Sequence, residues 1–125
     1  MSQENELFSH FAVVLAVSEI RKSISYYCDQ LGFKVTFESN DPIDYAVLKR
    51  GEVSIHLTKK NVDTNHSAHR TSVYIFVHNV DAVYREFIDN GVAIHNPVGD
   101  RDYGMRDFDI MDPDGYILSF GKGKS

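Results

Sequence analysis

Histidine and aspartate side chains are the groups in this chain whose types and spacing could bind a metal ion or transfer protons. Among six histidines, His66 and His69 stand three residues apart in "HSAH", a spacing that places two imidazoles on one face of a helical turn. The surrounding segment is polar and has no hydrophobic period, which indicates a loop. Two ligands rarely make a tight site, so we predict no specific metal site here and leave the role of the pair open.

Two further carboxylates stand together in "DPDG", residues 112–115, and could resemble a site for acid–base chemistry. This composition is also that of a tight turn, because proline presets φ, aspartate accepts hydrogen bonds from the turn, and glycine takes the positive-φ position. We therefore interpret Asp112 and Asp114 as turn residues.

Arg106 is the best candidate for a functional cation. Its guanidinium could pair with a carboxylate such as Asp109, Glu38 or one from another subunit, or could contact a ligand, and the sequence leaves these alternatives open. Cys28 has no evident base beside it and no second cysteine with which to form a disulfide. A single cysteine and a polar start without signal-peptide character predict a cytoplasmic protein.

Composition narrows the classes of partner. The chain has 125 residues, 42% of them hydrophobic and 25% charged, as expected of one globular domain. A net charge of −5 without a basic stripe disfavours nucleic acid, and no apolar run approaches the roughly 20 residues that cross a bilayer. The acidic balance weakly favours a cationic small molecule.

The hydrophobic pattern predicts the elements of a repeated unit. "FAVVLAV" at 11–17 is typical of a strand buried on both faces, the next segment has helical spacing up to Gly32, and "FKVTFES" alternates as a strand does. A hairpin with Gly51 at its turn follows. The same order recurs as a strand at 72–77, a helix capped by Asn79, a short strand that stops at Pro97, and a hairpin with Gly115 at its turn.

We therefore predict an α+β fold of two βαβββ modules that form a cupped mixed sheet with helices on the convex face. The domain spans 1–125, with module one at about 8–60, a linker at 61–71 and module two at 72–121.

Two stretches of the sequence, "VVLAVSEIRKSISYYCDQLGFKV" and "YGMRDFDIMDPDGYILSFG", resemble the vicinal oxygen chelate superfamily, which contains glyoxalase I, extradiol dioxygenases and bleomycin resistance proteins. The likeness is closest to the bleomycin resistance proteins, through Tyr103, Gly104, Arg106, Phe108 and the "DPDG" turn. The resemblance implies paired modules, usually in a homodimer with clefts near the subunit interface.

The resemblance also implies where a metal ion would be held. The family's ligand positions fall on Ala12, Ile55, Ser72 and Ser119, which supply neither imidazole nor carboxylate. A shift of one residue would bring His56 inward, but it would supply no set of partners. We therefore expect no metal, no cofactor and no catalytic residue.

These observations predict a metal-free binding protein that sequesters an aromatic or cationic small molecule, such as an antibiotic, in a dimer-interface cleft. The alternative is a metal-dependent lyase of the glyoxalase type or a dioxygenase, and a metal-free enzyme or a ligand sensor that uses the same cleft is also left open. Rings on the inward strand faces could equally be core residues. The predicted ligand-binding residues are Phe37, Tyr45, Ile55, Tyr74, Tyr103, Arg106, Phe108 and Ser119.

Overall fold

The computed structural model describes residues 7–60 and 72–124, so His66 and His69, whose role the sequence leaves open, lie outside the described residues. The first half contains β1 (Val13–Val17), α2 (Ile20–Ser25), a π-helical turn η1 (Tyr26–Gln30), β2 (Lys34–Ser39), β3 (Tyr45–Arg50) and β4 (Val53–Lys59). The second half contains β5 (Ser72–Phe76), α3 (Val80–Asp89), β6 (Ile94–Asp100), β7 (Met105–Met111) and β8 (Ile117–Gly123).

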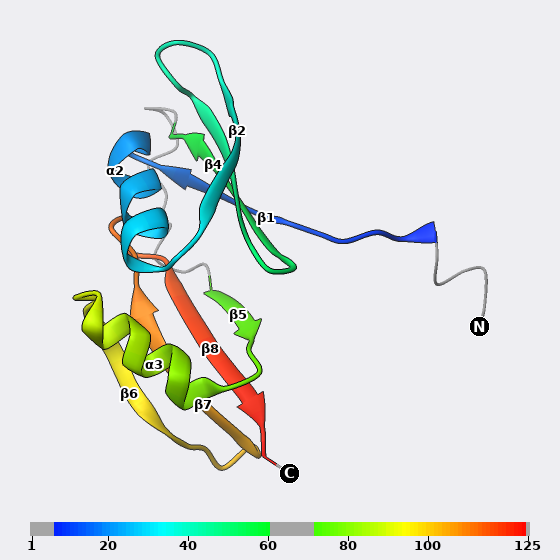
Figure 1. Ribbon diagram of the computed structural model, residues 1–125, viewed down its shortest axis with the longest axis vertical. Coiled ribbons are helices and arrows are strands. Elements are labelled where there is room, and N and C mark those ends of the chain that lie inside the picture. Colours follow the sequence, from blue (N-terminus) through cyan, green and yellow to red (C-terminus); the bar gives the residue numbers. More distant parts are fainter. Residues whose placement is uncertain (1–6, 61–71, 125) are drawn as a thin grey trace.

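Each half forms its own four-stranded mixed sheet, with order β1-β4-β3-β2 in the first and β5-β8-β7-β6 in the second. In both sheets the first strand is parallel to the last and the remaining pairs are antiparallel. The predicted α+β fold with two βαβββ modules is therefore confirmed (Figure 1). Both predicted hairpin glycines have positive φ, +59° at Gly51 and +92° at Gly115.

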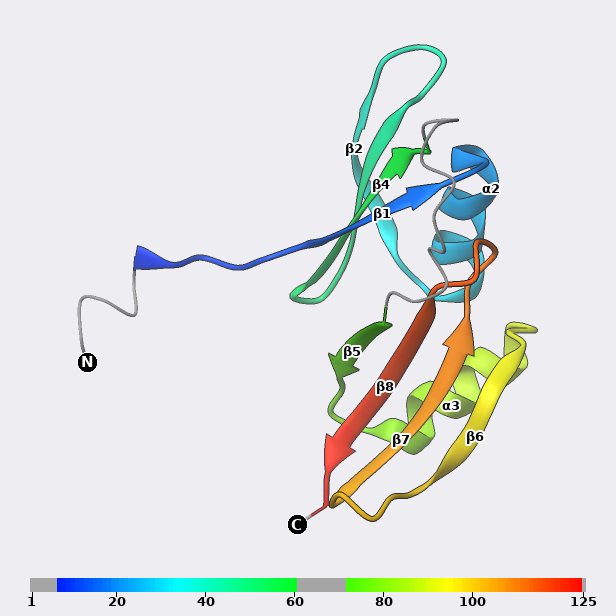
Figure 2. The same cartoon turned by 180° about the vertical axis from the view of Figure 1, so that it is seen from behind.

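The helices lie on one side of the two sheets and leave the other side open (Figure 2). Alternate residues of β1 show the consequence, because Leu15 and Val17 are buried under the helices whereas Val14 on the opposite face is 54% exposed. The prediction that this strand is buried on both faces is therefore wrong for the single chain. A run of β-branched residues predicts burial, but one module supplies helices for one face only.

The strand after α3 is longer than predicted, because β6 continues through Pro97 to Asp100. β6 is the edge strand of its sheet, and its pairing with β7 shifts register between Asn96 and Gly99. An edge strand with such an irregularity tolerates a residue that has no N–H to donate. Proline therefore does not end the strand here.

The two modules are joined by the "DPDG" turn of the second. The Tyr27 hydroxyl donates to Asp112 at 2.7 Å, and Asp114 accepts a hydrogen bond from the Ser18 backbone N–H at 2.9 Å. The Tyr116 hydroxyl also donates to the carbonyl of Ala16 on β1 at 2.8 Å. Burial raises the pKa of Asp112 above its ordinary value, and hydrogen bonds from the Tyr27 hydroxyl and from the backbone N–H groups of Asp114 and Tyr116 offset this only in part. The turn predicted from sequence is thus also the joint between the modules.

The segment that precedes β1 extends away from both modules (Figure 1). Its apolar side chains have little contact with the rest of the described chain, since Leu7, Phe8 and Phe11 are 79–87% exposed. Within residues 7–60 and 72–124, no helix has the length and apolar character needed to span a bilayer.

Candidate functional site

The open face of the first sheet is largely apolar. Register places Val14 of β1, His56 of β4 and Val47 of β3 side by side on this face, and Phe37 of β2 lies next to Val47. Tyr45 adds a hydroxyl that lies 2.7 Å from Nδ1 of His56, with the two rings edge to face at 5.5 Å. This face therefore offers aromatic and aliphatic surface and one imidazole.

His56 occupies the position that the sequence analysis gave to Ile55. Ile55 is fully buried in the core under α2, together with its neighbour Leu57 on the same face of β4. Counting the same number of residues from the turn glycine of each hairpin gives Ser119 in the second module and Ile55 in the first, and in the first module this count is off by one residue, which exchanges the faces of a strand. Ile55 thus lies on the core face of β4, where it also lines a hollow between β5 and the first module.

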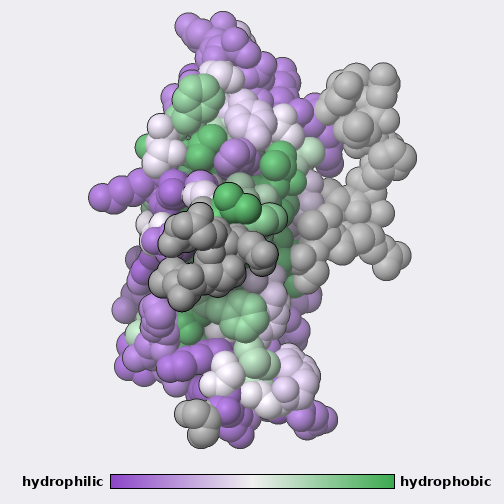
Figure 3. Space-filling view, turned by 90° about the vertical axis from the view of Figure 1, so that its right-hand side faces the viewer, coloured by the Kyte–Doolittle hydropathy of each residue, from purple (hydrophilic) through white to green (hydrophobic). Residues whose placement is uncertain are grey.

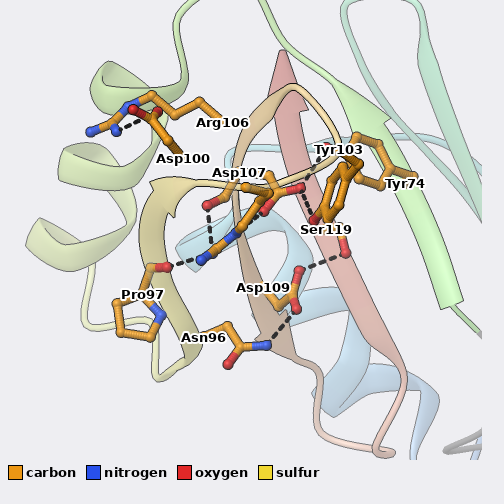
Figure 4. Close-up of polar contacts among 10 residues, drawn as sticks. Tyr74, Asn96, Pro97, Asp100, Tyr103, Arg106, Asp107, Asp109 and Ser119 are labelled. Atoms are coloured by element: carbon orange, nitrogen blue, oxygen red, sulfur yellow. Dashed lines mark hydrogen bonds and ion pairs between the residues drawn. The ribbon is translucent and has the colours of Figure 1, made fainter. Parts of the chain in front are cut away.

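The open face of the second sheet holds a connected polar network around Asp107 of β7 (Figure 4). The hydroxyls of Tyr74 and Tyr103 donate to Asp107 Oδ2 at 2.7 and 2.8 Å, and Arg101 Nε donates to Oδ1 at 2.7 Å. Burial opposes ionisation of Asp107, but these three hydrogen bonds outweigh it and hold the pKa of Asp107 below its ordinary value. Burial and the bond to Asp107 raise the pKa of Tyr74.

Asp109, two residues further along β7, lies on the same face with different partners. Its carboxylate accepts hydrogen bonds from Ser119 Oγ at 2.6 Å and from Asn96 Nδ2 at 2.8 Å (Figure 4). Ser119 was predicted from the sequence as a ligand-binding residue, whereas Asp107 and Arg101 were not. Asp109 was predicted only as a possible partner of Arg106. A signal was present, because "MDPDG" is preceded by "MRDFDI", in which the aspartates alternate with Phe108 and Ile110.

Tyr74 reaches Asp107 because it crosses above a glycine. A Cβ atom at Gly121 would meet the Tyr74 hydroxyl and would approach Cβ of Asp107 to 2.7 Å. Phe76 is the register neighbour of Gly121 on the same face, and its ring centroid lies 5.0 Å from that of Tyr74. The absence of a side chain at position 121 therefore brings an aromatic pair and a buried carboxylate together.

A hollow of about 460 Å³ lies at the edge of this aromatic pair, where β5 faces the first module. Apolar and aromatic side chains predominate in its lining, which includes Phe11, Val13, Val53, Tyr74, Ile75 and Phe76. On the side of the molecule away from the helices, apolar side chains gather in the middle and polar ones toward the ends (Figure 3). This combination of concavity and aromatic walls suits a small organic molecule.

Two other predicted ligand-binding residues lie on the helix side of the second sheet. Phe108 is fully buried in the core, stacked on Phe120 at a centroid distance of 5.4 Å. Arg106 pairs with Asp81 at 2.8 Å and with Asp100 at 3.1 Å, so its partners are neither Asp109 nor Glu38. The structure thus favours the structural alternative for both side chains. The remaining predicted ligand-binding residues lie on the open faces: Phe37, Tyr45, Tyr74, Tyr103 and Ser119.

The donor set on the open faces does not fit the divalent metal that related folds hold. Of the four positions that the resemblance implied, Ala12 has no donor atom and Ile55 is replaced on the open face by the single imidazole of His56. Ser119 is a weak neutral ligand whose hydroxyl already donates to Asp109. In the described part of the chain, no three histidine, cysteine or acidic side chains converge on one point.

The fold and its open faces define a class, and comparison with known proteins agrees. The model of the Glyoxalase/Bleomycin resistance protein/Dioxygenase superfamily matches residues 8–120, so the chain belongs to this superfamily. It is similar to the bleomycin resistance protein of Geobacillus stearothermophilus, with 32% identity covering 85% of this chain and 90% of the relative.

Two solved structures illustrate the likeness. The bleomycin-binding protein of Streptomyces verticillus, in complex with copper(II)-bleomycin, superposes with a TM-score of 0.75 at 28% identity, covering 94% of this chain and 98% of that one. TioX from Micromonospora superposes with a TM-score of 0.80 at 20% identity, over 93% and 99% of the two chains. The chain is thus a bleomycin resistance-like member of the superfamily.

Proposed function

We propose that this protein is a metal-free binding protein that sequesters an aromatic or cationic small molecule, such as an antibiotic of the bleomycin type. One observation carries the proposal: Phe11, Tyr74 and Phe76 line a hollow of about 460 Å³ together with aliphatic side chains, while no three potential metal ligands converge within residues 7–60 and 72–124. Sequestration requires affinity alone, and burial of flat apolar surface supplies it. We place this activity in the cytoplasm. The single cysteine, Cys28, cannot form a disulfide within the chain, which fits a reducing compartment.

We further propose that the working form is a homodimer in which the open face of one subunit is completed by its partner. Apolar side chains on the open faces, including Val14, Phe37 and Phe76, are 54–71% exposed in the single chain. The apolar segment before β1 has the same property. Large exposed apolar side chains gathered on one side of a molecule are costly in water and are typical of an interface.

The proposed ligand-contacting residues are those predicted side chains that lie on the open faces. They are Phe37 and Tyr45 on the first sheet, and Tyr74, Tyr103 and Ser119 on the second. Phe76 and His56 join them from the structure. The aromatic members are divided between the two sheets, so a ligand held between sheets of different subunits would be contacted on two sides.

Isothermal titration calorimetry with metal-free bleomycin and with copper(II)-bleomycin tests the binding proposal. We expect saturable binding, with one ligand for each cleft and a negative heat-capacity change from apolar burial. Absence of binding at millimolar bleomycin would contradict the antibiotic assignment. Light scattering after size-exclusion chromatography tests the dimer. A monomeric mass at a protein concentration of about 50–100 µM would contradict it.

Elemental analysis of untagged, purified protein separates this function from a metal-dependent lyase or dioxygenase. We expect substoichiometric nickel, zinc, manganese and iron. One tightly held ion for each subunit would overturn the metal-free assignment, because a divalent site of useful affinity needs three or four protein donors.

A further inference from the structure

Asp107 and Asp109 share one face of β7, yet their charges are balanced differently. Asp107 is 3% exposed and pairs with Arg101, whose guanidinium also donates to the carbonyl oxygens of Pro97 and Asp107. Arg101 directs Nε and Nη2 to this carboxylate and to the neighbouring backbone. The charge of Asp107 is balanced within the protein.

Asp109 receives hydrogen bonds from neutral groups only, Ser119 Oγ and Asn96 Nδ2. Among the ion pairs of the described residues, none involves Asp109. The two aspartates and Arg101 therefore leave one negative charge in excess on this face. Because both neutral donors hold the carboxylate in place, it is oriented before any ligand arrives.

Register places this charge near the aromatic surface. Asp109 of β7 pairs with Ser119 of β8, and Ser119 pairs with Tyr74 of β5. Neighbouring strands lie about 4.8 Å apart, so the backbones at Asp109 and Tyr74 are separated by two spacings, about 10 Å. The Tyr74 side chain crosses above Gly121 to reach Asp107 of β7, so its ring extends toward the strand that carries Asp109. Tyr74 and Phe76 line the hollow described above, so an aromatic surface lies within about 10 Å of the carboxylate on one face.

We propose that Asp109 is the cation-anchoring residue of the binding site, and that the site selects ligands with a positively charged group within about 10 Å of an aromatic ring system. This inference rests on the proposed binding function and adds the chemical class of ligand. A cationic group gains a charge-assisted hydrogen bond from Asp109. A neutral group at the same place also displaces water from the carboxylate but forms a weaker hydrogen bond with it. The positive charge therefore contributes to specificity as well as to affinity.

A matched pair of probes measures this selectivity directly. Dansylcadaverine carries a naphthalene ring and a terminal ammonium on a five-methylene linker, and its N-acetyl derivative is the same molecule without the charge. Fluorescence titration of the wild-type protein should give about tenfold tighter binding of the ammonium form at low salt, a gain that salt reduces. Equal affinities for the two probes would overturn the inference without any variant.

Substitution then assigns the preference to one residue. In Asp109→Asn the preference should fall to about twofold or less, while affinity for the acetylated probe stays within about twofold because the side-chain shape is kept. Asp89→Asn is the matched control, since it removes the same charge from the exposed end of α3 on the helix side and should keep the full preference. A preference that survives in Asp109→Asn, or disappears equally in Asp89→Asn, would overturn the assignment.

Bleomycin titrations distinguish failure of this inference from failure of the proposed function. If wild type binds bleomycin but the dansyl probes show no charge preference, the binding function stands and the anchoring role of Asp109 is overturned. If bleomycin is not bound while the charge preference and its loss in Asp109→Asn are observed, the anchor stands and the antibiotic assignment fails.

Discussion

The two sheets have the same strand order but opposite chemistry on their open faces. The first face has a single polar contact of note, between Tyr45 and His56. The second face joins Tyr74, Tyr103 and Arg101 through Asp107. Because both modules have the same βαβββ topology, the difference lies in side chains alone. Repetition of a fold therefore does not repeat its chemistry, and a dimer that places unlike faces opposite each other gains a cleft with one apolar and one polar wall.

The largest expected effect is on the stability of the second sheet. Asp107→Ala leaves Arg101 without its carboxylate and two tyrosine hydroxyls without an acceptor, and should lower the free energy of unfolding by about 2–3 kcal/mol. Urea denaturation followed by circular dichroism measures this loss. The matched change on the first face, His56→Ala, should cost about 1 kcal/mol, and equal losses would remove the contrast between the faces.

Ligand affinity should depend on aromatic residues of the second face more than on aliphatic residues of the first. Phe76→Ala removes an exposed ring that packs on Tyr74, and should weaken bleomycin binding about tenfold with little change in stability. Val14→Ala removes much less apolar surface and should weaken binding less than about threefold. Calorimetry on both variants decides the matter, and the reverse order would place the main contact surface on the first sheet.

Acid should weaken the second face through Asp107. Its folded-state pKa is depressed, so its ionised form contributes stability that is present above the unfolded value of about 3.9 and is lost as pH falls through the folded value. Asp112 has a raised pKa and acts in the opposite direction. Urea midpoints at pH 3 and pH 6 should therefore differ less in Asp107→Ala than in wild type. An unchanged difference would show that Asp107 does not carry this dependence.

The smallest effect should come from the polar contact on the first face. Tyr45→Phe removes only the hydroxyl near Nδ1 of His56 and should cost about 0.5–1 kcal/mol. It should leave the preference for the ammonium probe intact, because Asp109 lies on the other sheet. Loss of that preference in Tyr45→Phe would show that the two faces act on the cation together.

Most of the fold follows from local signals, whereas the site depends on register and on contacts between modules. Gly51 and Gly115 indicate the hairpins because few residues other than glycine adopt a positive φ. Asn79 caps α3 as predicted, because its side chain accepts a hydrogen bond from the Ala82 N–H at 3.0 Å. The π-helical turn after α2 has no such signal in the sequence, and it contains Tyr27, whose hydroxyl bonds Asp112 of the second module. Local patterns thus locate elements more reliably than they locate contacts.

Errors in the site have the same origin. Ile55 and His56 are adjacent, and counting from the turn glycine chose the wrong one because the two hairpin turns differ in length: β3 and β4 are joined by two residues and β7 and β8 by five. Arg106 pairs with Asp81, which lies 25 residues away on α3. This ion pair could be predicted only from the position of the helix on the sheet. Alternation in β7 could have indicated Asp107 and Asp109, because a half-exposed strand shows its polar face at every second residue.

Gly121 has a consequence for how the second face could change over time. The overlap of the Tyr74 hydroxyl with the space of a Cβ at this position means that even alanine would push the phenol aside. The ring would then lose its bond to Asp107, and Arg101 and Tyr103 would have to hold that carboxylate alone. The lack of a side chain at position 121 therefore determines the orientation of the Tyr74 ring. A substitution there would change the shape of the proposed binding surface although Gly121 itself is not a proposed ligand contact.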